Sequence, residues 1–145
     1  MSMRIDEYMK PADEAIEAEP VLGSEAYLGP ALVGALGAVM SGVANSARFG
    51  QDTTASVRSG YKSLALHALL ALRVSGLDPA RVNEVTPLRF TEDRDAALEL
   101  LLSRVSSVAR SGADTLGPRA AGLVVALVDH AEVVTGKTLG EILES

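Results

Sequence analysis

Residues 26 to 47 form a run of 22 consecutive residues without a charged side chain, which constrains the fold of this 145-residue chain more than any other feature. Glu25 and Arg48 bound the run, and Gly50 lies just beyond it. The large aliphatic residues recur at the three- and four-residue spacing of one helix face: Leu32, Leu36, Val39 and Val43, with Val33 and Met40 beside them. This spacing predicts an apolar helix over about 25–48.

The opposite side of this predicted helix carries only small residues: Gly34, Gly37, Ala38, Ser41, Gly42 and Asn45. A glycine inside a helix costs about 1 kcal/mol relative to alanine, and close approach of another helix is the usual compensation. We therefore expect burial on both sides, with Gly37 in a close helix contact. A membrane span is the alternative, because about 20 apolar residues can cross a bilayer. The few large aliphatic residues, and flanks without basic or aromatic clusters, favour the buried helix.

The segment 54–75 is predicted to be the helix that packs against the first one. A stripe of mostly small residues runs along it at the same spacing: Ser56, Gly60, Ser63, His67 and Ala71. Asp52, Thr53 or Thr54 can cap its start, and Gly76 ends it. Because the connection between the two helices is short, the pattern predicts an antiparallel hairpin in which Gly60 allows a close contact.

Two further long helices are predicted over about 92–111 and 118–135. The first has an apolar face and a charged or serine-rich face, as a surface helix does, and its inward residues are Ala97, Leu98, Leu101, Leu102, Val105, Val108 and Ala109. The second is apolar nearly all round, so we expect it to be central. Residues 1–22 form an acidic arm or short helix, and other short helices are expected after Asp78 and Thr138.

No alternating strand pattern with hairpin turns interrupts these helical segments. The expected fold is therefore an all-α, compact bundle of five to seven helices, in which residues 1–145 form a single domain. The central helices are those at about 25–48, 54–75, 92–111 and 118–135.

Composition and charge exclude several classes of protein. The chain has no cysteine, which excludes disulfides and cysteine-ligated zinc. The net charge of −6 is that of an acidic protein and lacks the basic footprint of a nucleic-acid binder. The N-terminus is acidic rather than basic, unlike a secretory or mitochondrial leader, so we expect a cytoplasmic protein.

Residues 131–138, "AEVVTGKT", match a loose form of the phosphate-binding loop. Such a loop needs a strand before it and a long helix after it, so that backbone N–H groups converge on the phosphate. Here the preceding run is predicted as helix, and only seven residues follow Thr138. We therefore interpret Gly136 as a helix end and Thr138 with Glu141 as a capping box that opens a last short helix.

The candidate ligand-binding residues are Arg48, Arg58 and Lys62. Arg58 and Lys62 lie four residues apart on one helix face, where like charges repel, and a bound anion would relieve that repulsion. The competing interpretation is that the acidic N-terminal arm covers them, or that they are simply solvated.

His67 and His130 are the only histidines, and with Asp129 and Glu132 they could form a metal site or an acid–base pair. Neither has a second histidine at helical spacing, so hydrogen-bonded packing is the simpler expectation, and we predict no metal and no cofactor.

The predicted function is that of a non-enzymatic helical protein acting through self-association or protein–protein contacts, in a structural, assembly or regulatory role. Three strongly apolar helices in one small domain favour a homo-oligomer, most simply a dimer, over a nucleic-acid or membrane partner. The alternative is a small-ligand-binding or metal-dependent helical enzyme that uses Arg58 and Lys62, or His67 and His130.

Overall fold

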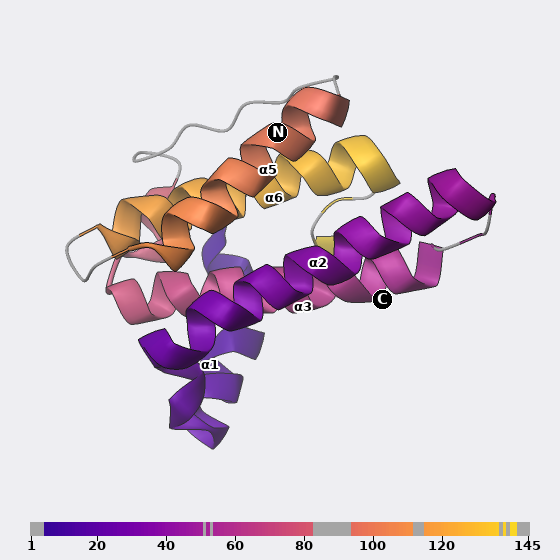
Figure 1. Ribbon diagram of the computed structural model, residues 1–145. Coiled ribbons are helices and arrows are strands. Elements are labelled where there is room, and N and C mark those ends of the chain that lie inside the picture. Colours follow the sequence, from indigo (N-terminus) through magenta and orange to yellow (C-terminus); the bar gives the residue numbers. More distant parts are fainter. Residues whose placement is uncertain are drawn as a thin grey trace.

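The computed structural model describes residues 5–50, 52, 54–82, 94–111, 115–136, 138 and 140–141. All regular structure within these residues is helical (Figure 1). The long helices are α2 (Glu25–Phe49), α3 (Thr54–Ser75), α5 (Arg94–Ala109) and α6 (Leu116–Thr135), and α1 (Lys10–Ala18) is shorter. Single 3₁₀ turns are η1 (Ile5–Tyr8), η2 (Pro20–Gly23) and η3 (Pro79–Arg81). The prediction of an all-α bundle of five to seven helices is confirmed.

Three glycines end long helices at the positions that the sequence predicted. Gly50, Gly76 and Gly136 follow α2, α3 and α6, with φ angles of 66°, 79° and 73°. These angles lie in the left-handed region, where a side chain is disfavoured and glycine is the usual residue. The predicted start of the third long helix, at residues 92 and 93, lies outside the described residues, and its end at Ala109 comes two residues before the predicted one.

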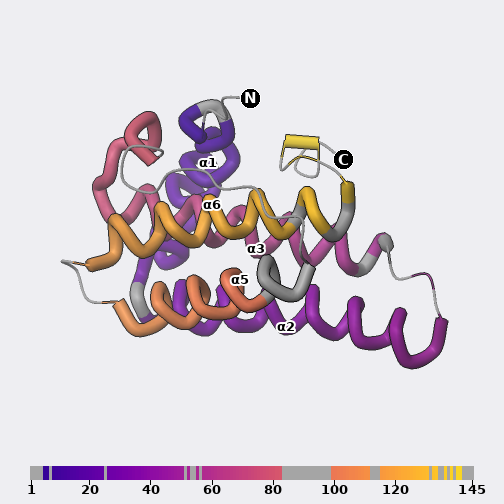
Figure 2. Tube along the Cα trace, turned by 90° about the horizontal axis from the view of Figure 1, so that it is seen from above, coloured from indigo at the N-terminus to yellow at the C-terminus, as the bar shows by residue number. Residues whose placement is uncertain are grey.

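The four long helices form two antiparallel hairpins that pack against each other. α2 and α3 form one hairpin, and α5 and α6 form the other (Figure 1). α3 packs on α6 and α2 packs on α5, so that the four helices surround one core (Figure 2). The acidic helix α1 packs across α3 on the side away from α5.

The contact between α2 and α3 places a large residue of each helix against a glycine of the other. A Cβ added to Gly60 would lie 2.8 Å from Cγ2 and 3.0 Å from the backbone nitrogen of Val39. A Cβ added to Gly42 would lie 2.6 Å from Cγ2 of Val57. The predicted close contact at Gly60 is therefore confirmed, although it is formed with an aliphatic partner and not with a second small-residue face.

The expectation that α2 is buried on both sides is wrong. Leu32, Leu36 and Val39 of its aliphatic stripe are buried on the side that packs on α3 and α5, but Val33, expected beside them, is 53% exposed. A Cβ on Gly34 or Gly37 would stand in open space, with no atom outside its own stretch of helix within 4 Å. The reason is that α2 lies at the edge of the bundle, where α3 and α5 both pack on its aliphatic side. The close helix contact predicted for Gly37 is absent.

α6 is the central helix, as its apolar sequence predicted. Residues 120–130 are buried without interruption, including the polar side chains of Asp129 and His130. Within residues 99–109 of α5, whose burial is described, the buried stripe consists of Leu101, Val105 and Val108 and is narrower than expected. The burial predicted for Ala97 and Leu98 lies outside the described side chains. Leu102 is 44% exposed and Ala109 is also exposed, so both were wrongly placed inward, because α5 contacts its neighbours along one side only.

Candidate interaction surface

The most unusual surface of the molecule is the outer face of α2. This face consists of the exposed residues Ala26, Pro30, Val33, Gly34, Gly37, Ala38, Ser41, Ala44 and Asn45. None of them is charged, and Val33, at 53% exposure, is the only large aliphatic residue among them. A surface helix normally turns charged residues toward water, so α2 departs from that rule over nearly its whole length.

The outer face of α2 continues into a shallow groove between α2 and α3. The groove is lined only by glycine, alanine and serine: Gly34, Ala35, Ala38, Ala55, Ser59, Gly60 and Ser63. Ser59 and Ser63 follow Ala55 at four-residue spacing, so they extend one small-residue stripe along α3. Such a groove lets the backbone of another helix approach closely, because no long side chain stands in the way.

The end of α2 projects beyond its neighbours. Residues 44–50 are all exposed, whichever way they face, and Figure 2 shows this end of the α2–α3 hairpin reaching past α5 and α6. Phe49 is 56% exposed, and the guanidinium of Arg48 lies 4.6 Å from the centre of its ring. Exposed turns without large apolar contacts contribute little to the stability of a monomer.

Of the three candidate anion-binding residues, only Arg48 lies at this projecting end, and the other two lie at different levels along the hairpin. Val39 lies opposite Gly60 and Val57 opposite Gly42, so Arg58 stands level with Ser41 and Lys62 level with Gly37. Arg48 is seven residues beyond Ser41 on α2, which is about 10 Å along the helix axis. Neither the groove between α2 and α3 nor the cavity described below is lined by any of the three.

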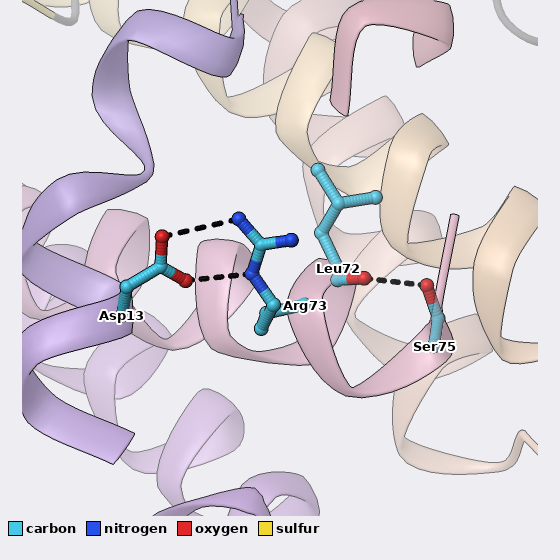
Figure 3. Close-up of polar contacts among 4 residues, drawn as sticks. All are labelled: Asp13, Leu72, Arg73 and Ser75. Carbon is cyan, nitrogen blue, oxygen red and sulfur yellow. Dashed lines mark hydrogen bonds and ion pairs between the residues drawn. The ribbon is translucent and has the colours of Figure 1, made fainter. Parts of the chain in front are cut away.

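The acidic N-terminal helix binds a different basic residue. Asp13 of α1 accepts two hydrogen bonds from Arg73 of α3, at 2.6 Å from Nε and 3.1 Å from Nη2 (Figure 3). Arg73 lies in the last turn of α3, whereas Arg58 and Lys62 lie in its first turns. The interpretation that the acidic arm covers Arg58 and Lys62 requires a contact between them. The Asp13–Arg73 ion pair does not provide that contact, because it lies at the other end of α3.

Each histidine is hydrogen-bonded to a tyrosine on a neighbouring helix. Nδ1 of His67 lies 2.6 Å from the carbonyl oxygen of Ser63, which can only accept, so the neutral ring carries its hydrogen there. Nε2 of His67 then accepts the hydroxyl of Tyr27 at 2.7 Å. The buried hydroxyl of Tyr61 is hydrogen-bonded to Nδ1 of His130. The two pairs tie α3 to α2 and to α6.

Within the described part of the chain, no three histidine or acidic side chains are grouped as metal ligands. The segment that matches a phosphate-binding loop is helical up to Thr135, and Gly136 caps that helix with its N–H on the carbonyl of Glu132 at 2.9 Å. Thr138 and Glu141 exchange hydrogen bonds of 3.2 Å, which confirms the predicted capping box. Lys137 lies outside the described residues.

The chain matches no protein-family model, no curated protein and no solved structure. Of the helices described, α2 alone is long and apolar enough to span a membrane, with a mean hydropathy of 1.5 over its most apolar part, of which 33% is buried. This property of α2 rests on its length and composition alone.

Proposed function

We propose that this protein is a non-enzymatic homodimer whose role is structural or regulatory, and that the outer face of α2 and the adjoining groove form the contact between the two copies. The proposal places it in the cytoplasm, without a nucleic-acid partner. Its main support is the uncharged outer face of α2. Charged residues are depleted at the centre of protein interfaces, whereas the outer faces of surface helices normally carry them.

The residues of this face favour a protein neighbour over lipid. Leucine, isoleucine, phenylalanine and valine stabilise a helix surface in a bilayer, but this face carries only Val33 of that kind. Small residues such as Gly34, Gly37 and Ala38 instead permit close packing between helices. A second copy offers the same uncharged face, and two identical faces related by a two-fold axis form a closed dimer.

The size of the surface sets the expected affinity. The outer face of α2 is about 30 Å long, and together with α3 it is about 20 Å wide, which gives on the order of 600 Å² on each copy. Specific interfaces begin at about 1,200 Å² in total, so this surface reaches the lower limit. We therefore expect a dimer that dissociates on dilution, and not an obligate one.

A charge placed in the outer face of α2 tests the proposal. Gly37→Arg adds a side chain where no atom of the protomer lies within 4 Å, so it should not disturb the fold. The matched control is Ser103→Arg, at an exposed position on α5. Light scattering at micromolar concentration should give twice the 15.1 kDa chain mass for the native protein and the control, and the monomer mass for Gly37→Arg.

Three outcomes oppose the proposal. A native protein that stays monomeric over the micromolar range, or a Gly37→Arg variant that remains dimeric, would show that this face does not join two copies. Flotation of the native protein with phosphatidylcholine vesicles, lost in Gly37→Arg but retained in Ser103→Arg, would assign the face to lipid.

A further inference from the structure

A cavity of about 270 Å³ lies at the end of the bundle where α2 and α6 begin and where α3 and α5 end. It is distant from the projecting end of α2, because Leu28 and Gly29 line it and Phe49 is 20 residues further along the same helix, about 30 Å away. Val74, 39% exposed, and Ala109, also exposed, belong to its lining, so the cavity opens to solvent.

Among the described residues, the lining of this cavity carries no charged side chain. Apolar side chains and glycines form most of this described lining, and its side-chain polar groups are the hydroxyls of Ser75 and Ser111. Ser75 donates its hydrogen to the carbonyl of Leu72 at 2.6 Å (Figure 3), and Ser111 donates to the carbonyl of Ser107 at 2.9 Å. Neither hydroxyl has a second hydrogen to donate to a ligand.

Two charged residues adjoin this lining in sequence, Arg73 beside Val74 and Arg110 between Ala109 and Ser111. Nε of Arg110 donates to the carbonyl of Ser106 at 3.3 Å. Arg73 extends to Asp13, on the opposite side of α3 from Ser75 (Figure 3). Among the described lining residues, a ligand would therefore meet neither a charged side chain nor a free hydroxyl donor. An ionised molecule would lose hydration there without gaining a counter-ion, whereas an uncharged apolar molecule would gain by leaving water.

Gly29 keeps part of this cavity open. It lies inside α2, where glycine costs about 1 kcal/mol relative to alanine. A Cβ at this position would make only ordinary contacts, 3.8 Å from the oxygen and 3.9 Å from the Cα of Ala109. Close helix packing therefore requires glycine at position 60 but not at position 29. At position 29, the absence of a side chain enlarges the cavity.

We propose that this cavity binds an uncharged, mainly apolar small molecule of the size of one ring or two fused rings. An engineered apolar cavity of about 150 Å³ binds benzene, so the larger volume here suits a molecule somewhat larger than benzene. The site is independent of the proposed dimer contact, which lies on the outer face of α2. It requires no metal and no charged group.

Indole is a suitable probe, and benzoate is its charged counterpart of similar size. Saturation-transfer NMR on the full chain should show binding of indole and not of benzoate, and indole should raise the melting temperature. Gly29→Leu should remove the indole signal and, because it fills an open space, should itself raise the melting temperature. Ser103→Leu adds the same side chain on the exposed side of α5 and should retain indole binding.

Ala109→Leu provides a second test if Gly29→Leu does not fold, since Ala109 is an exposed lining residue that tolerates a larger side chain and would block the opening. The proposal is overturned if indole does not bind the native protein, if benzoate binds equally well, or if a folded blocking variant still binds indole. Dissociation of the dimer by indole would also overturn the proposal of a small-molecule site. It would show that a side chain of the second copy fills the cavity in the dimer and that indole displaces it.

Discussion

Gly60 of α3 lies directly against the backbone of Val39 of α2, with 3.0 Å between the site of a Cβ and the Val39 nitrogen. Backbone atoms cannot move aside as a flexible side chain can, so this position accepts no side chain without separating the two helices. Gly37, a helix-interior glycine on the outer face of α2, has only open space around it. Both glycines lie inside a helix on a predicted small-residue side, yet their structural requirements are opposite.

Gly60→Ala should therefore destabilise the protein, while Gly37→Ala should stabilise it. At position 60, overpacking should lower the free energy of unfolding by about 1–3 kcal/mol. The better helix propensity of alanine offsets only part of this loss. At position 37 the propensity gain of up to about 1 kcal/mol is unopposed within one protomer. Urea unfolding at a protein concentration low enough to keep the chain monomeric measures both effects. Equal effects of the two substitutions would contradict the packing described for α2 and α3.

Tyr61→Phe should cost more stability than Tyr27→Phe. Tyr61 is fully buried and its hydroxyl bonds to the buried His130, so the substitution leaves a polar nitrogen in the core without this partner, at a cost of about 1–3 kcal/mol. Tyr27 is only half-buried, so water can replace part of its bond to His67, and we expect a loss of about 0.5–1.5 kcal/mol in the free energy of unfolding. Urea midpoints rank the two variants, and the reverse order would show that the Tyr61 bond contributes little.

Asp13→Asn should weaken the attachment of α1 to α3 only slightly. The Asp13–Arg73 ion pair has two good hydrogen bonds, but the side chains of Asp13 and Arg73 are 44% and 40% exposed. Because water screens exposed charges, we expect the free energy of unfolding to fall by only about 0.2–1 kcal/mol. The loss should shrink in concentrated salt, because salt screens exposed charges. Glu14→Gln, which removes the longer and more exposed pair with Lys10 at 3.9 Å, is the control and should leave the unfolding midpoint unchanged.

The sequence predicted the helices well because their ends are encoded locally. Gly50, Gly76 and Gly136 each supply a left-handed residue at a helix end, and Thr138 with Glu141 supplies a capping box. These signals need no knowledge of the neighbouring elements. The central position of α6 followed from its apolar residues on every side, since such a helix has to be covered all round.

The sequence did not show which glycines of α2 face another helix. Gly37 and Gly42 belong to the same small-residue side, yet only Gly42 meets a neighbour, because the boundary of the contact depends on where α3 crosses. Glycine spacing permits close packing but does not show that a helix is there. The inward placement of Leu102 failed for a similar reason, since it lies one step outside a narrow buried stripe.

The polar contacts between distant parts of the chain could not be predicted from the sequence either. Asp13 and Arg73 are 60 residues apart, and several other acids and bases offered equally plausible pairs. The partners of His67 and His130 depend on how α3 sits between α2 and α6. The cavity beside Gly29 could not be predicted either, because it depends on the ends of four helices at once.

Disulfide cross-linking between two copies tests the self-association account most directly, because the native chain contains no cysteine. Single cysteines would be introduced along the outer face of α2, at Val33, Gly37, Ser41 and Asn45, with Ser103→Cys as the exposed control. If two α2 helices meet about a two-fold axis, the position nearest that axis should form a covalent dimer much faster than the control under mild oxidation. If all four positions cross-link no faster than Ser103→Cys, the outer face of α2 does not join two copies.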